Sequence, residues 1–262
     1  MKAILGTARF ELENLLEKKA TWILTAAYTF LTFAVCFFDD LRQNYFSSME
    51  SLPIALNNFV LPIVLISVLI SVISPIFAGD KEQETDQIPA ACLVGRKGRS
   101  IAKIIGAILF SLTIVLLLEV ITLVLCGCFG LCDTEILIRY VNAEIALNPV
   151  WSAWMHFGFS AVTLIVGCII LTITVLFVSC SMKNTQSVIG LSGIIVLIEF
   201  IINKFSFPAL IQEYNIWIFF RPYYLFITEL INFSPFENLL LYTLCFLPLC
   251  AAATWQIIRN GG

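Results

Sequence analysis

The chain has 262 residues, of which 60% are hydrophobic and 13% are charged, and its formal net charge is −3 at pH 7. Soluble globular domains are roughly half apolar and one quarter charged, so this composition excludes a soluble fold. The small net charge gives no reason to expect a nucleic-acid partner. The apolar residues fall in runs of about 20, each long enough to cross a bilayer as an α-helix. We therefore predict an all-α, polytopic membrane protein with one transmembrane domain over residues 1–262.

Residues 1–19 are predicted to form an amphipathic helix that lies in the membrane interface. Apolar side chains recur there at spacings of three and four residues, and charged side chains occupy the other faces. The apolar positions are Ile4, Leu5, Ala8, Leu12, Leu15 and Leu16. Because acidic residues interrupt the segment, we do not expect a signal peptide there.

Six hydrophobic spans are predicted after this helix. They cover residues 20–38, 53–78, 101–127, 151–180, 187–203 and 239–257. Cytoplasmic segments of membrane proteins retain Lys and Arg. Of the fifteen basic residues, eleven lie before the first span, between the second and third spans, between the fourth and fifth spans, or after the sixth span. The other four are Arg42, Arg139, Lys204 and Arg221. We predict a multi-pass protein of the cell membrane with both termini in the cytoplasm, in agreement with the even number of spans.

The segment 204–238, between the fifth and sixth spans, is predicted to be extracellular. It is rich in aromatic residues but is interrupted by Pro208, Pro222 and Pro235, so it is too broken for one spanning helix. It fits either short re-entrant helices that dip into the outer leaflet or an aromatic loop at the membrane interface.

The motifs of several enzyme classes are absent from the sequence. There is no G-x-x-x-x-G-K-[ST] phosphate loop, so any ATP and Mg²⁺ would bind to a partner subunit. The single histidine, His156, excludes a multi-histidine metal site. Cys126, Cys128 and Cys132 lack zinc-ribbon spacing, although one disulfide among them would fit an oxidising exterior. We expect no catalytic residue, metal or cofactor in this chain.

The most informative segment is the predicted cytoplasmic loop 79–100, which changes the sign of its charge midway. Acidic residues dominate its first half, basic residues dominate its second half, and a short apolar run at 88–94 lies between them. An apolar knob flanked by opposite charges can dock in a groove of a soluble partner, with the charges setting the register. Alternatively, the basic residues only anchor the third span, which would leave the acidic half unexplained.

The order of residues in this loop resembles a motif of the ABC-2 type permeases, the membrane subunits of ATP-binding-cassette exporters. That motif runs roughly E-R-E-x-G-T, then a leucine-rich turn, then P-x-S-R and K. Its matches here are Asp80, Lys81, Glu82, Thr85, Arg99 and Lys103, with Arg96 as a second candidate for the arginine. The sequence departs from the motif at Glu84, where glycine is common, and at residues 95–98, which replace the proline-containing turn.

The resemblance implies an ABC-2/ABCG-like exporter fold, with a cytoplasmic coupling helix between the second and third spans and re-entrant short helices before the sixth. The amphipathic helix would brace the coupling helix, and the F-R-P-Y-Y-L stretch at 220–225 is similar to a proline-centred stretch of the family. The implied partners are a cassette ATPase, a second permease copy or paralogue that completes a homo- or heterodimer, and the lipid bilayer. The implied ATPase-coupling residues are Asp80, Lys81, Glu82, Glu84, Thr85, Leu93, Arg96, Arg99 and Lys103.

Two acidic residues, Glu119 and Glu199, are predicted at membrane depth, where a charge is costly unless it has a function or a partner. Together with Arg221 and Tyr223 they form a candidate substrate pathway that could meet a cationic group. Alternatively, each acid snorkels to the outer interface or forms an ion pair with Lys204, Arg139 or Arg221.

Taken together, these features predict the permease subunit of an exporter, which is not an enzyme by itself and relies on ATP hydrolysed by another subunit. The expected substrate is amphipathic or hydrophobic, such as a peptide, toxin or bacteriocin, and lipid-like or drug-like compounds fit as well. The alternative is an ion-coupled secondary transporter that uses Glu119 and Glu199, although the sequence has no inverted-repeat pattern.

Overall fold

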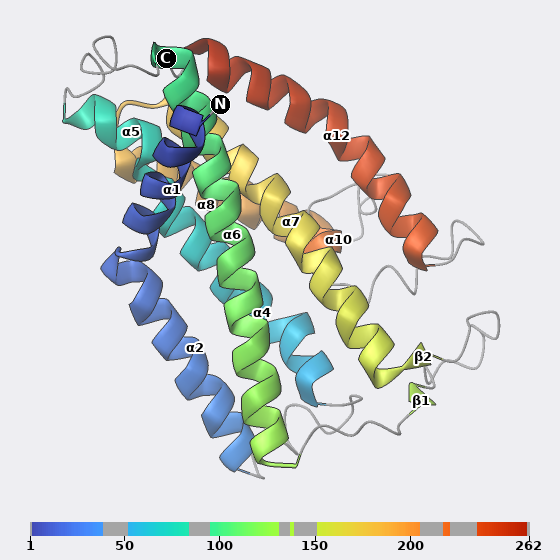
Figure 1. The fold of residues 1–262 in the computed structure, drawn as a ribbon. Helices are drawn as coiled ribbons and strands as arrows, with labels where there is room; N and C mark the ends of the chain where they lie inside the picture. Colours follow the sequence, from blue (N-terminus) through green and yellow to red (C-terminus); the bar gives the residue numbers. More distant parts are fainter. Residues whose placement is uncertain are drawn as a thin grey trace.

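The computed structural model describes residues 2–38, 52–83, 95–130, 137–138, 151–204, 217–220 and 235–260. These residues are helical almost throughout (Figure 1). The helices are α1 (Lys2–Leu16), α2 (Lys19–Phe37), α4 (Leu52–Ile73), α5 (Pro75–Glu82), α6 (Gly95–Cys128), α7 (Ala153–Ser181), α8 (Thr185–Lys204), α10 (Trp217–Phe220) and α12 (Pro235–Asn260). Two short strands, β1 (Leu137–Ile138) and β2 (Trp151–Ser152), pair antiparallel.

Within the described residues, five helical stretches are long and apolar enough to cross a membrane. They are Lys19–Phe37, Val60–Glu82, Lys97–Cys128, Phe157–Ser181 and Phe236–Arg259. The helical character predicted from the sequence is therefore confirmed, with five stretches that could span a membrane where the sequence predicts six spans. The predicted span 187–203 falls within α8, whose described apolar part, Thr185–Ile198, is shorter than the other five stretches.

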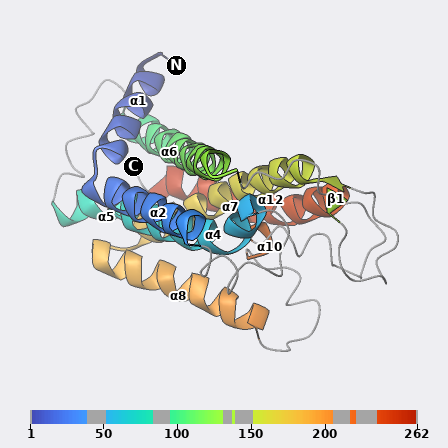
Figure 2. The same cartoon turned by 90° about the horizontal axis from the view of Figure 1, so that it is seen from below.

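The helices form one bundle in which α6 and α7 run side by side (Figure 1). Helix α4 packs against α2, α6 and α7, while α12 lies along α7. Helix α8 contacts α7, α5 and α4 and lies along one side of the bundle (Figure 2). Helices α1 and α5 and the C-terminal end of α12 lie at the same end of the bundle, which we call the α5 end.

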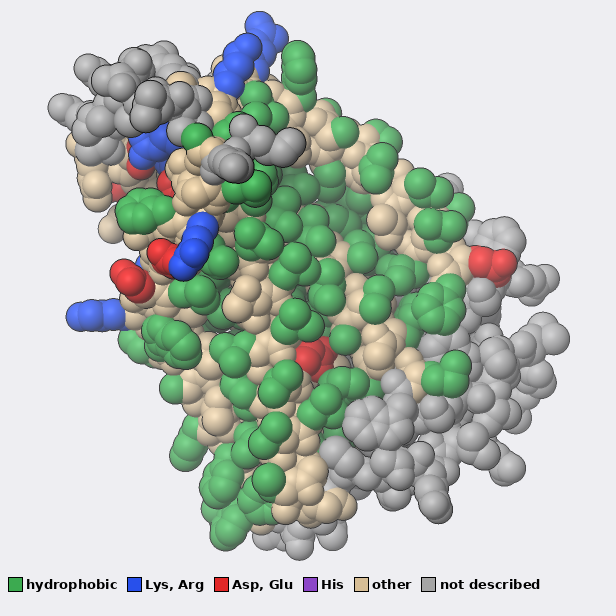
Figure 3. All heavy atoms as spheres, in the orientation of Figure 1, with side chains coloured by type: hydrophobic (Ala, Val, Ile, Leu, Met, Phe, Trp, Pro, Cys, Tyr) green, Lys and Arg blue, Asp and Glu red, His purple; other side chains and the backbone are tan. Residues whose placement is uncertain are grey.

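Apolar side chains cover the outside of the bundle as well as filling its core (Figure 3). Phe30 on α2 is 73% exposed, and Trp255 and Leu249 on α12 are 69% and 66% exposed. In water such a surface would aggregate, whereas in a bilayer it faces lipid tails. Charged side chains on the face seen in Figure 3 gather mainly at the α5 end. The distribution of side chains thus agrees with a membrane-embedded bundle that has one polar end.

The predicted second span, 53–78, is interrupted. Helix α4 ends at Ile73 and α5 begins at Pro75, because proline has no amide hydrogen to continue the helical ladder. Ser179 on α7 closes this break: its hydroxyl donates to the carbonyl of Ser74 at 2.6 Å and accepts from the amides of Phe77 and Ala78 at 3.2 and 3.1 Å. Three backbone groups that the break would leave without partners are therefore satisfied by one side chain.

The predicted loop 79–100 is shorter than expected. Helix α5 continues to Glu82, and α6 begins at Gly95, so only residues 84–94 of this loop lie outside the described residues. Gly95 has a φ of +64°, a backbone conformation that glycine adopts without the steric cost of a Cβ. Asp80, Lys81 and Arg99 are therefore helical residues. Leu93 and the rest of the predicted coupling helix lie outside the described residues.

Helix α10, from the aromatic segment before α12, lies against the middle of α7. A Cβ on Gly167, midway along α7, would lie 2.8 Å from Cβ of Phe219, so only glycine permits this approach. Phe219 and Phe220 are buried, and the Phe219 ring meets Phe246 of α12 edge-on with centroids 5.5 Å apart. The aromatic segment thus contributes to the core at half the height of the bundle.

The close contact at Gly167 predicts that Gly167→Ala destabilises the fold. Overpacking a tight contact costs about 1–3 kcal/mol, so the denaturant midpoint should fall when unfolding in mixed micelles is followed by circular dichroism. Gly158→Ala is the matched control on the same helix, since a Cβ there meets no atom within 4 Å. Alanine is the better helix former, so this control should leave stability unchanged or raised. Equal effects of the two substitutions would contradict the packing of α10 on α7.

Candidate functional site

A cluster of three charged side chains joins α5 to α6 at the α5 end, and we call it the Asp80 cluster. Asp80 accepts from Arg99 Nη2 at 3.0 Å and from Lys103 Nζ at 2.5 Å. Lys103 is 3% exposed, donates also to the carbonyl of Ile76 at 2.5 Å, and lies 4.8 Å from the centroid of the Phe77 ring. A buried ammonium is tolerated only with such partners, so Asp80 is the counter-ion that Lys103 requires.

The helical register explains why these residues meet. Arg99 and Lys103 are four residues apart near the start of α6 and therefore share one face. Asp80 lies in the last part of α5, and its carboxylate reaches both basic side chains of α6. An acidic residue from the first half of the predicted loop thus forms ion pairs with two basic residues that follow it in the sequence.

The next two residues of α5, Lys81 and Glu82, hold the connection between α7 and α8. Lys81 Nζ donates to the carbonyl of Cys180 and, at 3.5 Å, to that of Met182, both at the C-terminal end of α7. Glu82 Oε2 accepts from the hydroxyl of Thr185, the first residue of α8, at 2.9 Å. A cation at a helix C-terminus and an anion at an N-terminus both complement the helix dipoles. The end of α5 thus links α6, α7 and α8.

Lys18, at the elbow between α1 and α2, ties the N-terminal helix to the same place. Its Nζ donates to the carbonyl of Val72 at the end of α4 at 2.7 Å. Burial lowers the pKa of Lys18 to about 8, while the negative charge of Glu11 raises this pKa and the positive charge of Lys103 lowers it further. Lys18, Lys81, Lys103 and Asp80 therefore join the α1–α2 elbow, α4, α5, α6 and α7 at the α5 end.

The N-terminal helix packs on α6 instead of lying apart from the bundle. Ala8 and Leu15 are buried, and a Cβ on Gly106 would lie 2.9 Å from Cβ of Glu11 and 3.0 Å from the carbonyl oxygen of Ala8. Part of the apolar face predicted for residues 1–19 therefore packs against α6. Leu5 and Phe10 of the same helix remain exposed.

Glu119 on α6 lies within the bundle and is 4% exposed, so the alternative that it snorkels to the interface is wrong. Asn57 Nδ2 on α4 donates to Glu119 Oε1 at 2.9 Å and to Oε2 at 3.0 Å. Asn57 is not among the residues predicted from the sequence, although the pair Asn57 and Asn58 inside an apolar span is a usable signal. Glu119 follows Lys103 by sixteen residues, or about 24 Å along the helix, so it is remote from the Asp80 cluster.

The remaining predicted site residues are not brought together by the described part of the structure. Glu199 lies in α8 and Arg96 in the first turn of α6, but their side chains are outside the described set. Glu84, Thr85, Leu93, Arg221 and Tyr223 also lie outside the described residues. Within the described ranges, no group of three His, Cys, Asp or Glu side chains could hold a metal ion.

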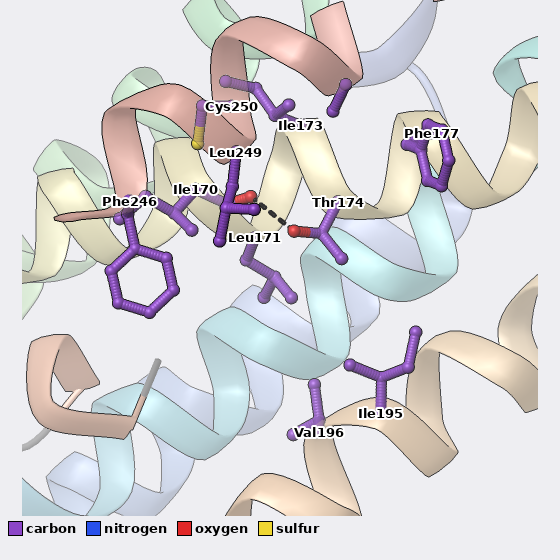
Figure 4. A pocket seen from close by; sticks show the side chains of 11 residues that line it. Ile170, Leu171, Ile173, Thr174, Phe177, Ile195, Val196, Phe246, Leu249 and Cys250 are labelled. Atoms are coloured by element: carbon purple, nitrogen blue, oxygen red, sulfur yellow. Dashed lines mark hydrogen bonds between the residues drawn. The ribbon is translucent and has the colours of Figure 1, made fainter. Parts of the chain in front are cut away.

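A cavity of about 190 Å³ lies between α7, α8 and α12 (Figure 4). Its lining is apolar and includes Ile170, Phe177, Val196 and Phe246. The hydroxyl of Thr174 points toward the carbonyl of Ile170 and donates to it at 2.9 Å, so its hydrogen is already used within α7. The cavity is therefore suited to an apolar group.

Comparison with known proteins gives no assignment for the chain: no protein-family model and no curated protein matches its sequence.

The ion pair between buried Lys103 and partly buried Asp80 predicts that Asp80→Asn is destabilising. The substitution leaves the Lys103 ammonium buried without its counter-ion, and removal of one partner from a buried pair costs about 3 kcal/mol or more. Glu13→Gln is the control, because Glu13 forms an exposed ion pair with Arg9 at 2.8 Å and such pairs contribute little. Unfolding in mixed micelles measures both changes, and equal midpoints for the two variants would contradict the role assigned to Asp80.

The lowered pKa of Lys18 predicts a specific pH dependence. Between about pH 8 and pH 10.5 the folded chain binds fewer protons at Lys18 than the unfolded chain, so the free energy of unfolding should rise with pH in this window. Lys18→Met removes the group and should flatten the rise. Denaturant midpoints measured across this range test the effect, and identical pH profiles for the two proteins would refute it.

Proposed function

We propose that the chain is the membrane subunit of an ATP-driven exporter and that a separate cassette ATPase subunit supplies ATP hydrolysis. The observation that carries the proposal is the convergence of Asp80, Lys81, Glu82, Arg99 and Lys103 at one polar end of an apolar bundle. These residues are the described part of the motif that resembles the ABC-2 permeases. Through their contacts, a displacement caused by a docked partner would be transmitted to the helices of the bundle.

This transmission begins with the connection between α5 and α6, which would seat on the ATPase. A displacement of this connection moves the last turn of α5, and with it Asp80, Lys81 and Glu82. Asp80 passes the displacement to α6, while Lys81 and Glu82 pass it to the α7–α8 connection. A packed, hydrogen-bonded element of this kind transmits motion because it is stiff.

In the proposed topology the α5 end faces the cytoplasm, as the positive-inside rule requires, and both termini lie on that side. Helix α8 is the fifth of six spans. In this topology helix α10 is a re-entrant element that enters from the outer side. Its packing against Gly167, halfway along α7, supports this assignment. Non-helical backbone at that depth is tolerated when protein surrounds it, and the burial of Phe219 and Phe220 meets this condition.

The proposed substrate is amphipathic or hydrophobic: a peptide such as a toxin or bacteriocin, or a drug-like compound. The apolar cavity between α7, α8 and α12 supports an apolar cargo, and its lining carries no charged side chain. A second copy of the chain or a paralogue would complete the pathway. Glu199, Arg221 and Tyr223 remain candidate pathway residues.

Affinity purification of the tagged chain from its native membrane tests this function. We expect a cassette ATPase subunit to copurify and vanadate-sensitive ATP hydrolysis to appear in the eluate. Arg99→Glu and Glu82→Lys should greatly reduce this activity while the chain stays in the membrane. Glu13→Lys, which reverses an exposed charge on α1, should not. A folded chain that binds no ATPase, or reversals that leave ATP hydrolysis and transport intact, would refute the proposal.

One observation favours the alternative of an ion-coupled secondary transporter: Glu119 is an acid buried in the bundle, and such groups form the ion sites of secondary transporters. The two functions differ in their energy source. Transport that survives depletion of ATP but stops when the proton gradient is collapsed would select the alternative.

A further inference from the structure

The contact between Glu119 and Asn57 has an unusual balance of hydrogen-bond donors and acceptors. Both carboxylate oxygens of Glu119 accept from the same atom, Asn57 Nδ2. No ion pair among the described residues includes Glu119. Asn57 is completely buried, and its Oδ1 has no hydrogen-bond partner within the described part of the chain. The pair therefore has three acceptor oxygens and a single donor nitrogen.

The hydroxyls of Tyr28 and Thr122, which lie beside this contact, cannot correct the imbalance. The hydroxyl of Thr122 donates its one hydrogen to the carbonyl of Leu118 at 2.9 Å. In the 2.5 Å contact between Tyr28 and Thr122, the donor is consequently Tyr28. The hydrogens of both hydroxyls are thus committed, and neither is left for Asn57 Oδ1.

The orientation of the Asn57 amide does not change the conclusion. If its oxygen and nitrogen exchange places, the oxygen meets the carboxylate and the nitrogen becomes the buried group without a partner. In either orientation the amide offers one donor side and one acceptor side. A carboxylate matches only the donor side, whereas a carboxylic acid matches both.

We propose that Glu119 binds a proton and is held as a neutral carboxylic acid paired with Asn57. The acid hydroxyl donates to Asn57 Oδ1, and the amide donates to the acid carbonyl, which gives two hydrogen bonds and no charge. The neutral form avoids the cost of an ionised carboxylate at membrane depth. This inference goes beyond the proposed function and is independent of it, since proton binding is measured on the chain alone.

A proton fits the site better than a metal ion does. Hard cations take six or more oxygen ligands in a protein site. Among the described groups of this contact, the free oxygens are those of one carboxylate and one amide, because the hydroxyls of Tyr28 and Thr122 are committed. Within the described residues, the titratable groups that interact with Glu119 from neighbouring helices are Tyr28 on α2 and Cys168 on α7, while α4 supplies the uncharged Asn57. None of these groups is a cation that would favour the ionised form.

Loss of the proton would weaken the contact between α4 and α6. The ionised carboxylate would retain one shared amide donor, and Asn57 Oδ1 would again have no partner. The site is therefore a proton-dependent link between these two helices, about 24 Å along α6 from Lys103 of the Asp80 cluster.

Infrared spectroscopy of the purified chain in lipid nanodiscs tests the proposal. At neutral pH the spectrum of the unmutated protein should contain the carbonyl band of a carboxylic acid, which Glu119→Gln should lack. The band should disappear at alkaline pH as a carboxylate band appears. Asn57→Leu should shift the acid band to higher frequency, because the carbonyl loses its hydrogen bond. Glu13→Gln, an exposed site, should change only the carboxylate bands.

The opposite result is equally clear. If the difference between the unmutated protein and Glu119→Gln at neutral pH lies in the carboxylate bands alone, Glu119 is ionised and the proposal is wrong. If Glu119→Gln does not fold, Asn57→Leu decides in its place. A carboxylic-acid carbonyl band at neutral pH that this substitution moves to higher frequency supports the proposal, and the absence of such a band from the unmutated protein overturns it.

Discussion

The break between α4 and α5 imposes the constraint on which the rest of the structure depends. A helix interrupted within an apolar bundle leaves backbone groups that must find partners inside the protein, because lipid offers none. Ser179 meets this requirement at Ser74, Phe77 and Ala78. The ammonium groups of Lys18 and Lys103 occupy two further carbonyls on either side of the break. The backbone groups at this one break therefore bind side chains from the start of α2, from α6 and from α7.

This arrangement gives the polar end its functional meaning. The helix α5 that follows the break is short, and it carries Asp80, Lys81 and Glu82, which contact three other helices. A displacement of the connection between α5 and α6 would therefore be transmitted to three other helices at once. In the proposed exporter, the apolar helices would respond as units because their cores are closely packed, and the polar contacts at the α5 end would determine which of them move together.

Much of this architecture could be predicted from the sequence, since hydropathy locates the spans and the order of charges marks the polar end. The contacts that define the sites could not. Ser179 meets Ser74 across 105 residues, and Asn57 meets Glu119 across 62, so no local pattern reports either pair. Gly167 is an ordinary glycine in a helix until α10 is placed against it. Such pairings follow from tertiary packing, which periodicity within one segment does not contain.

The measurement that tests the central claim most directly is a double-mutant cycle between Ser179→Ala and Asp80→Asn, followed by unfolding in mixed micelles. If the break and the Asp80 cluster act as one unit, the two changes should be non-additive, with an interaction energy of about 1 kcal/mol or more. Ser181→Ala is the control, since its hydroxyl is exposed and bonds only within α7. Changes from Ser179→Ala and Asp80→Asn that add within about 0.5 kcal/mol would show two independent sites and contradict the account.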